Sequence, residues 1–356
     1  MRILVIALSG IGDALLFTPA LVRVKQEFPD DTIDALVMFK GAKQIYERTG
    51  LFNTVIYHDF LKSPKLKSLS FTLSLRGKYD FSINIYPSNR REYNLIQYLI
   101  GARKRGAVEY LRGNFKQLGF LNNTTIVEQD TLHNVEENMA LVERLFGLES
   151  GSIPDLLLPL SKEDTAFVRT FVASHSIMDN ELVIGFHAGS AVFKNHINRR
   201  WEPEKFAALG KRFIEDNDAK VLVFGGPDES GLKKDIVGQI GSPRAIAVDA
   251  PGIPETTALI KRCDLFVTND SSLMHIASAM KRKIVAVIGP TNINYIHPWH
   301  ADYEIASLYL DCAPCFIYSP KPLTCSRSDL KYKCIKELTV DMVYSKSMHL
   351  LKDPAR

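Results

Sequence analysis

The sequence predicts an α/β protein built from two doubly wound, Rossmann-like domains in tandem, facing a central cleft. Short apolar runs rich in β-branched residues alternate with amphipathic helical patterns in both halves of the chain, which is typical of parallel α/β architecture. The alternation is interrupted once, by an extended stretch that contains Pro154 and Pro159. A length of 356 residues suits two domains better than one, because a single hydrophobic core rarely grows that large.

The first predicted domain covers residues 1–160. Its apolar runs predict parallel strands over residues 2–8, 32–39, 54–58, 81–86 and 104–108. Apolar residues at helical spacing predict one helix over residues 14–28, directly behind the first strand. Residues 61–70 contain three lysines among serines and a proline, and we expect a mobile basic loop there.

The second predicted domain covers residues 161–335 and repeats the pattern. Its strands are expected over residues 182–189, 220–226, 245–249, 265–270 and 284–289. Several of them end in glycine, acidic or hydroxyl residues, and ligands of open parallel sheets bind at the carboxyl ends of the strands. These loops are therefore the predicted binding site. Residues 336–356 carry an amphipathic pattern, and we expect this last helix to pack back on the first domain.

Composition narrows the class of protein. Hydrophobic residues make up 46% and charged residues 24%, as in ordinary globular proteins, and a net charge of +4 is too small for a general nucleic-acid binder. No apolar run is long enough to span a bilayer, and no signal-peptide pattern is present, so we expect a cytoplasmic protein. Basic clusters at Arg90, Arg91 and residues 103–105 would suit a phosphorylated or carboxylated ligand, peripheral contact with the anionic surface of the inner membrane, or ordinary surface charge.

The turn after the first strand excludes a dinucleotide-binding fingerprint. Gly10 and Gly12 are followed by Leu15, where that fingerprint requires a third glycine, and the chain has no Walker A loop. Asp13 ends the turn, at a place where it would repel a bound phosphate. One interpretation makes Asp13 the N-terminal cap of the next helix, and the other makes it a general base in the cleft. Both can hold, because a capping carboxylate keeps a second oxygen.

A cationic loop at residues 189–200 follows the first strand of the second domain. Lys194, Arg199 and Arg200 could neutralise a diphosphate, while Ser190 and the loop amides donate hydrogen bonds to it. A solvated basic loop is the alternative interpretation.

Residues 267–280 join a strand end to the start of a helix. Asp270 ends the strand, and Ser271 and Ser272 present hydroxyl and amide groups at a helix N-terminus, which favours anions. His275 lies one turn further along. Helix capping by Asp270 and Ser271, and a core position for His275, are the alternatives.

Five segments together carry a resemblance to a known family. They are "LSGIGDALLFTPAL", "HAGS…RRW.PEKFAAL", "FGGPDE", "LFVTNDSSLMHIASAM" and "VIGPTN", in this order. Taken together, the chain resembles glycosyltransferase family 9, the ADP-heptose:lipopolysaccharide heptosyltransferases, over almost its whole length. The resemblance implies a GT-B fold and an inverting, metal-independent enzyme. Such an enzyme moves heptose from ADP-heptose to an inner-core sugar of lipopolysaccharide.

The resemblance also assigns roles to individual residues. It makes Asp13 the base for the acceptor hydroxyl, and it places Arg199 where the family has lysine, with Lys194 as the alternative. Ser272 stands where the family has glycine. The implied donor-binding residues are Gly189, Ser190, Arg200, Gly226, Glu229 (or its neighbour Asp228), Asp270, Ser271, Ser272 and His275. The implied acceptor-binding residues are Gly12, Arg90 and Arg91.

Four of the five cysteines crowd into one segment, at Cys312, Cys315, Cys325 and Cys334. In a reducing compartment we expect them either to hold a structural zinc or iron ion or to be ordinary buried thiols. No cofactor is expected for catalysis. Two alternatives to heptosyl transfer stay open: a GT-B transferase with another nucleotide-sugar donor or a protein acceptor, and a binding protein that senses nucleotide sugars without turnover.

Overall fold

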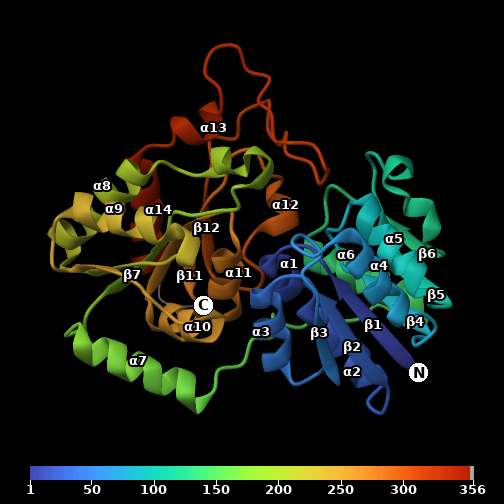
Figure 1. The fold of residues 1–356 in the computed structure, drawn as a ribbon. Coiled ribbons are helices and arrows are strands. Elements are labelled where there is room, and N and C mark those ends of the chain that lie inside the picture. Colours follow the sequence, from blue (N-terminus) through green and yellow to red (C-terminus); the bar gives the residue numbers. More distant parts are fainter. Residues whose placement is uncertain (353–356) are drawn as a thin grey trace. The chain divides into compact units, whose positions relative to one another are not determined.

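The computed structural model describes residues 1–352 and divides into two compact units (Figure 1). The first unit contains Met1–Pro159 together with Tyr318–Pro320, and the second contains Leu160–Ile317 and the chain from Lys321 onward. Each unit is built around its own six-stranded sheet. All strand pairs in both sheets are parallel, so the predicted α/β class is confirmed.

The first sheet has the strand order β3-β2-β1-β4-β5-β6. Its strands are β1 (Arg2–Ala7), β2 (Thr32–Val37), β3 (Thr54–Tyr57), β4 (Phe81–Asn84), β5 (Lys104–Glu109) and β6 (Thr124–Val127). The central strand β1 is buried from its second residue onward, as expected for a parallel sheet covered on both faces. The strand order changes direction between β1 and β4, and doubly wound sheets bind ligands at such a switch point.

The helices of the first unit depart from the sequence prediction in two places. They are α1 (Ile11–Leu16), α2 (Thr18–Glu27), α3 (Lys40–Thr49), α4 (Lys65–Ser74), α5 (Arg91–Ile100) and α6 (Asn134–Phe146), with short 3₁₀ turns η1 (Phe115–Gln117) and η2 (Gly119–Leu121). The single helix expected over 14–28 is two helices, because Pro19, in the first turn of α2, has no amide to continue the hydrogen bonding of α1. The loop expected at 61–70 is wrong beyond Pro64, where α4 begins.

The second sheet has the order β12-β11-β10-β7-β8-β9, with its switch point between β7 and β10. Its strands are β7 (Val183–His187), β8 (Lys220–Val223), β9 (Ala245–Ala247), β10 (Leu265–Asn269), β11 (Lys283–Val287) and β12 (Tyr303–Ala306). The helices around it are α7 (Lys162–Ser174), α8 (Pro203–Asn217), α9 (Ser230–Ile240), α10 (Ile253–Arg262), α11 (Ser272–Ala279), α12 (Ile293–Ile296), α13 (Lys333–Lys336) and α14 (Val340–Lys352), with 3₁₀ turns η3 (Phe193–Arg199) and η4 (Pro227–Glu229). The edge strands β6 and β12 were not predicted, since neither is a continuous apolar run.

The last helix does not follow the sequence prediction. The described part of α14 packs against β11, β12 and α8 of the second unit, whereas the amphipathic pattern over 336–356 was expected to cover the first domain. Its apolar side chains Val343 and Leu350 join the core that contains Trp201. Residues 353–356 of the expected helix lie outside the described residues.

A short piece of the cysteine-rich segment belongs to the first unit. The Tyr318 hydroxyl accepts a hydrogen bond from Asn134 Nδ2 at 2.9 Å. The backbone carbonyl oxygen of Tyr318 accepts a second one from Asn89 Nδ2 at 2.8 Å. The Tyr318 ring stands edge-on to Tyr86, with the ring centroids 5.5 Å apart. Residues far apart in the sequence therefore complete one polar cluster at the carboxyl end of β4.

The glycine in β7 is a packing requirement of the second sheet. A Cβ atom at Gly185 would lie 2.5 Å from the Phe266 ring and 2.9 Å from Cys263 Sγ. We predict that Gly185→Ala lowers the free energy of unfolding of the second unit by about 1–3 kcal/mol, because the core cannot absorb the methyl group without strain. Urea unfolding followed by tryptophan fluorescence measures this, since Trp201 and Trp299 both lie in the second unit.

Gly238→Ala is the matched control. Gly238 lies inside α9 with open space around the added Cβ, so the substitution should stabilise the helix by about 0.5–1 kcal/mol. Equal effects of the two substitutions would contradict the packing argument.

Candidate active site

Asp13 lies at the switch point of the first sheet, just after β1. Its Oδ2 accepts a hydrogen bond from the Gly10 amide at 2.6 Å, so the carboxylate is held by the turn that starts α1. Gly12 beside it is buried, and Asp13 is half-buried. The N-terminal cap of α1 is Gly10, so the prediction of Asp13 as the cap itself is wrong: Asp13 is the third residue of the helix, and its carboxylate reaches back to the amide of the cap residue. A carboxylate held in this way can also act as a base.

Buried tyrosines surround the Asp13 charge. Burial raises the pKa of Tyr93 to about 12, with Arg90 opposing the rise and Asp13 adding to it. The Asp13 charge also adds to the burial that raises the pKa of Tyr46 and of Tyr110. These side chains stay neutral near pH 7 and keep their hydroxyl protons.

The two arginines predicted for the acceptor behave differently. The Arg90 guanidinium lies 5.8 Å from the centroid of the Tyr93 ring, beside the group of tyrosines around Asp13. Arg91 is exposed and pairs with its neighbour Glu92 at 3.2 Å. The structure thus brings Arg90, but not Arg91, toward the Asp13 neighbourhood.

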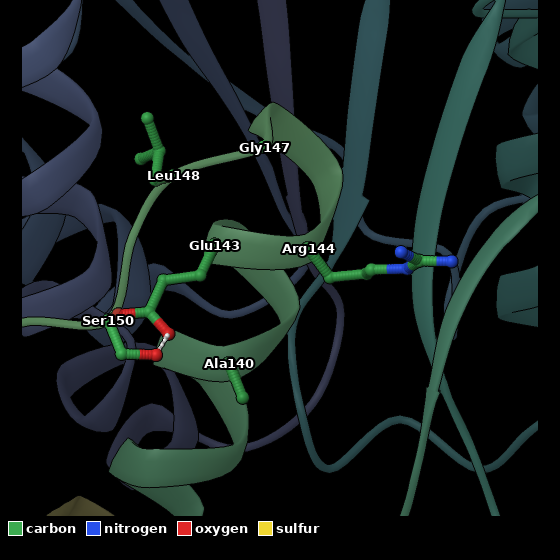
Figure 2. Close-up of a pocket in the computed structure, with 6 residues that line it drawn as sticks. All are labelled: Ala140, Glu143, Arg144, Gly147, Leu148 and Ser150. Atoms are coloured by element: carbon green, nitrogen blue, oxygen red, sulfur yellow. Dashed lines mark hydrogen bonds between the residues drawn. The ribbon is translucent and has the colours of Figure 1, made fainter.

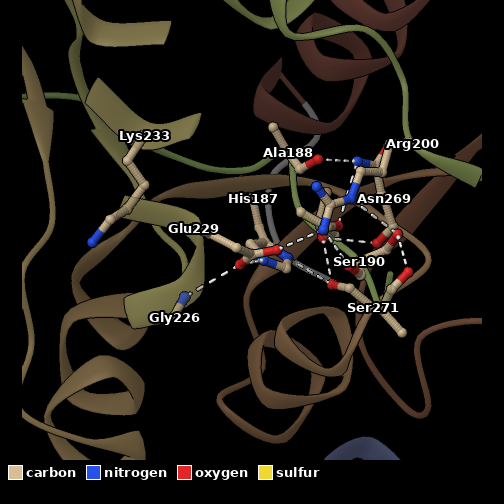
Figure 3. A network of polar contacts seen from close by, with 12 residues as sticks. His187, Ala188, Ser190, Arg200, Gly226, Glu229, Lys233, Asn269 and Ser271 are labelled. Carbon is tan, nitrogen blue, oxygen red and sulfur yellow. Dashed lines mark hydrogen bonds and ion pairs between the residues drawn. The ribbon is translucent and has the colours of Figure 1, made fainter. Parts of the chain in front are cut away.

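Asn269, at the end of β10, holds both ends of the cationic loop in the second unit. Its Nδ2 donates to the Ala188 carbonyl at 2.7 Å, and its Oδ1 accepts from the Trp201 amide at 3.0 Å (Figure 3). Trp201 is fully buried, and its indole N–H donates to the Leu338 carbonyl at 2.9 Å. A single amide side chain therefore closes the loop at residues 189–200.

Glu229 is the centre of a partly buried polar network after β7 and β8 (Figure 3). Its Oε1 lies 3.1 Å from Arg200 Nη2, and its Oε2 lies 3.1 Å from His187 Nε2. Burial alone would raise the Glu229 pKa, but hydrogen bonding from His187 and the Arg200 charge outweigh it and hold this pKa below its ordinary value. Arg200 also donates to the backbone oxygen of Ser190, so Glu229 and Ser190 together fix its guanidinium.

Close packing explains the glycine at position 189. A Cβ atom there would lie 1.9 Å from Glu229 Oε1, so only glycine permits the carboxylate to reach Arg200. The Gly226 amide donates to Glu229 Oε2 at 3.2 Å, whereas Asp228, the alternative ribose ligand, is exposed.

Arg199, the residue in place of the family's lysine, is paired with Asp270. Arg199 Nη1 lies 2.6 Å from Asp270 Oδ2, and the Thr291 hydroxyl donates to the same oxygen at 2.7 Å. The guanidinium lies 4.9 Å from the centroid of the Phe316 ring. Its Nε is buried and has no hydrogen-bond partner among the described residues, so this cation keeps an unused donor.

The start of α11 places two serine hydroxyls, the backbone amides of its first turn and a histidine ring in this cluster. The Ser271 hydroxyl contacts His187 Nδ1 at 2.8 Å and Thr268 Oγ1 at 3.2 Å, and Ser272 is the half-buried first residue of the helix. Burial lowers the pKa of His275 to about 4, so its ring is neutral at physiological pH. His275 Nδ1 is buried without a hydrogen-bond partner in the described part of the chain.

Lys194 is positioned by the cysteine-rich segment. It has a left-handed backbone with φ of 53°, and its carbonyl accepts a hydrogen bond from the Leu323 amide at 2.8 Å. Its side chain is half-buried. The backbone of the loop that carries the predicted cations is thus held from both the β10 side and the 312–334 side.

Sequence analysis did not single out four residues of this cluster. These are His187, Asn269, Thr291 and Phe316. His187 and Asn269 are polar residues that end buried strands, and that signal could have found them. Thr291 and Phe316 have no local signal, because their partners Asp270 and Arg199 are far away in the sequence.

The four clustered cysteines are reduced and close to one another. Burial, and then the charges of Cys315, Cys325 and Cys312, raise the pKa of Cys334 to about 11. Over residues 1–352, no group of three or more His, Cys, Asp or Glu side chains is arranged to hold a metal ion.

A separate pocket in the first unit takes no part in these clusters (Figure 2). It is formed around the C-terminal end of α6 by Ala140, Glu143, Arg144, Gly147, Leu148 and Ser150. Glu143 there accepts a hydrogen bond from the Ser150 hydroxyl at 3.0 Å. Helix α6 starts after the carboxyl end of β6 and runs back along the sheet, so its C-terminal end lies at the amino ends of the strands. Asp13 lies at their carboxyl ends.

Two doubly wound units, with a carboxylate at the switch point of one sheet and paired cations at that of the other, have the architecture of a GT-B glycosyltransferase. Comparison with known proteins gives the family. The model of glycosyltransferase family 9 (heptosyltransferase) matches residues 69–323, and the chain belongs to this family. It is therefore an enzyme of glycosyl transfer, as predicted.

The similarity extends over the whole chain. Lipooligosaccharide heptosyltransferase 2 of Campylobacter jejuni is 26% identical over 99% of both sequences. The solved Escherichia coli ADP-heptose lps heptosyltransferase II has a TM-score of 0.75 at 20% identity, covering 99% of this chain and 98% of that one. A family 9 glycosyltransferase from Veillonella parvula has a TM-score of 0.76 at 24% identity, covering 98% and 97%. These structures confirm the predicted GT-B fold.

Within residues 1–352, no helix is both long and apolar enough to cross a membrane.

Glu229→Gln should destabilise the second unit at neutral pH. Arg200 and His187 would lose a charged partner in a buried setting, which costs about 1–3 kcal/mol. Because the folded-state pKa of Glu229 is below its unfolded value, the stabilisation is present above the unfolded pKa and is lost as the pH falls through the folded one. The difference in unfolding free energy between the two proteins should therefore shrink as the pH is lowered from about 6 toward about 3.

Urea unfolding at several pH values measures this difference, and Asp228→Asn serves as the control because that acid is exposed. A Glu229→Gln protein as stable as the parent at pH 7 would show that the network contributes nothing.

Proposed function

We propose that this heptosyltransferase is an inverting enzyme that moves heptose from ADP-heptose to an inner-core sugar of lipopolysaccharide. The observation that carries the proposal is the group of cations and hydroxyls at the ends of β7 and β10, where Arg199 pairs with Asp270 and Arg200 with Glu229. The printed names of its relatives support the substrates: one acts on lipooligosaccharide, and another is an ADP-heptose lps heptosyltransferase. In this proposal the first unit binds the acceptor and the second binds the donor.

Asp13 is the base in the proposed reaction. Its carboxylate takes the proton of the acceptor hydroxyl as that oxygen forms a bond to the anomeric carbon of heptose. The bond between the anomeric carbon and the diphosphate oxygen breaks in the same step, and ADP leaves with the electron pair. A single displacement of this kind inverts the anomeric centre.

The charge on the departing diphosphate is stabilised by the second unit. Arg199 and Lys194 supply positive charge, and the amides at Ser271 and Ser272 supply dipoles at the start of α11. Fixed cations of this kind do the work that a metal ion does in other transferases, so transfer proceeds without a metal cofactor. The unused Nε donor of Arg199 supports its assignment to a phosphate.

The remaining donor contacts follow from the same cluster. Glu229 and Asp270 accept hydrogen bonds from sugar or ribose hydroxyls, while Gly189, Ser190, Arg200 and Gly226 shape the loops around the diphosphate. His275 acts as a neutral ligand, since its buried Nδ1 has no partner in the described structure and its pKa is about 4. On the acceptor side, Gly12 and Arg90 contact the phosphorylated core, and the exposed Arg91 adds positive charge at the surface. The enzyme works at the cytoplasmic face of the inner membrane, in peripheral contact with it.

Calorimetric titration with ADP, UDP, GDP and NAD in metal-free buffer tests the donor assignment. We expect ADP to bind most tightly, and Arg199→Ala to weaken ADP binding because a cation facing the diphosphate is lost. A preference for UDP or GDP would keep the reaction type and overturn the donor. Binding of none of the four would contradict the proposed donor site.

Asp13→Asn separates an enzyme from a protein that only binds nucleotide sugars. Asparagine can still accept the Gly10 amide hydrogen bond, but it cannot take up a proton. We expect kcat for heptosyl transfer to fall about 10²–10⁴-fold with unchanged ADP affinity in calorimetry. Full activity in this variant would exclude Asp13 as the base.

We also propose a structural zinc or iron ion at the cysteine-rich segment. Cys312, Cys315, Cys325 and Cys334 supply four thiols whose charges already influence one another, and thiolates are favoured ligands of both metals. The ion would hold the segment that positions Lys194, with no part in the transfer step.

Elemental analysis of the purified protein tests this site. We expect about one zinc or iron per chain, lost in Cys334→Ser and retained in Cys263→Ser, which removes a buried thiol from outside the segment. A stable, metal-free parent protein would overturn the proposal.

A further inference from the structure

Three segments of the first unit account for the net positive charge of the whole protein. Residues 61–78, 90–105 and 111–123 contain twelve Lys and Arg side chains and a single acid, Glu92. The chain has 44 basic and 40 acidic residues, so the rest of it has 32 and 39. The three segments thus carry a net charge of +11, and everything else carries −7.

The fold brings these segments together. They contain α4, α5 and the two 3₁₀ turns η1 and η2. Helix α5 contacts α4 and both 3₁₀ turns, and Figure 1 shows α4 and α5 side by side. We call the surface of residues 61–78, 90–105 and 111–123 the basic face.

The basic face also exposes large apolar side chains. It holds nine of the seventeen large hydrophobic residues that are exposed in the described structure, on 47 of the 356 positions. Leu66 and Phe115 are 81% and 79% exposed, and Phe120 pairs its ring with Phe115 at 5.3 Å. Leu69 and Leu73 are 43% exposed on the same helix as Leu66.

Core packing does not explain this exposure. In the ten residues of α4, Thr72 is the one buried side chain, so the leucines of this helix face water at a cost in free energy. Leu66, Leu69 and Leu73 recur at helical spacing on α4, and exposed apolar side chains gathered in this way mark an interaction surface.

The mixture of side chains identifies the partner. Leucine and phenylalanine enter the boundary between lipid headgroups and acyl chains, while lysine and arginine next to them meet anionic headgroups. The long basic side chains can extend to the headgroups with their stems on the apolar layer. A polyanion in water would use the cations and leave Leu66, Leu73 and Phe115 exposed.

We propose that the basic face is the membrane-docking surface of this enzyme, with Leu66 and Phe115 entering an anionic bilayer and the surrounding lysines binding its headgroups. The inference rests on the peripheral membrane contact of the proposed function and gives it a surface and a lipid class. The proposed docking surface includes none of the residues assigned to the donor, so an experiment can contradict the docking surface and the donor site independently of each other.

Sedimentation with lipid vesicles tests the proposal. We expect the full chain to bind vesicles of phosphatidylcholine with about one-third phosphatidylglycerol, and to bind pure phosphatidylcholine at least about tenfold more weakly, with salt reducing the binding. Leu66→Ser with Phe115→Ser should lower binding to the anionic vesicles about tenfold or more. Lys65→Gln, Lys67→Gln and Lys116→Gln together should have a similar effect.

The control carries Met178→Ser and Lys211→Gln, an exposed apolar residue and an exposed lysine of the second unit. It should bind vesicles like the parent, and all variants should bind ADP like the parent. Equal binding to both lipids, or unchanged binding in the Leu66 and Phe115 variant, would overturn the docking surface. Vesicle binding without ADP binding would overturn the donor assignment and leave the basic face intact.

Discussion

The side-chain amide of Asn269 is the constraint on which the second unit's active-site cluster depends. It bonds at once to the carbonyl of Ala188 and the amide of Trp201, the two residues that flank the cationic loop. Trp201 is fixed in turn by burial and by its indole hydrogen bond. Because both flanking residues are held, the two ends of the twelve-residue loop lie at a fixed distance from each other. Arg199 and Arg200 are the last two residues of the loop, next to the anchored Trp201.

Arg199 and Arg200 differ in how firmly their hydrogen-bond partners hold them. Arg200 is held by a carboxylate that also bonds His187 and a backbone amide, so its position is fixed without a ligand. Arg199 shares Asp270 with Thr291, and its Nε–H has no partner among the described residues. A diphosphate can therefore accept a hydrogen bond from Arg199 without disrupting the contacts of Asp270. Replacing a whole buried ion pair by apolar residues often leaves stability unchanged, whereas removing one partner is costly, so these pairs fix orientation more than they add net stability.

Sequence patterns predicted the parts of this structure whose causes are local. The central strands are continuous apolar runs because both faces of each sheet are covered. Asp270 and Arg199 were singled out because the end of a strand and a cationic loop can both be recognised from the sequence alone. Strands β6 and β12 were missed because edge strands need less apolar surface. Helix α4 was missed because it buries almost nothing. Thr291 and Phe316 act through contacts with residues 21 and more than 100 positions away, which no local pattern encodes.

The membership of Tyr318–Pro320 in the first unit bears on how the chain is made. Domains generally fold as units during synthesis, the N-terminal one first. Here the amides of Asn89 and Asn134 meet Tyr318 only after nine-tenths of the chain has left the ribosome. Until then these two hydrogen bonds and the ring contact with Tyr86 cannot form. The first unit can form its sheet early, but its final packing is completed together with the second.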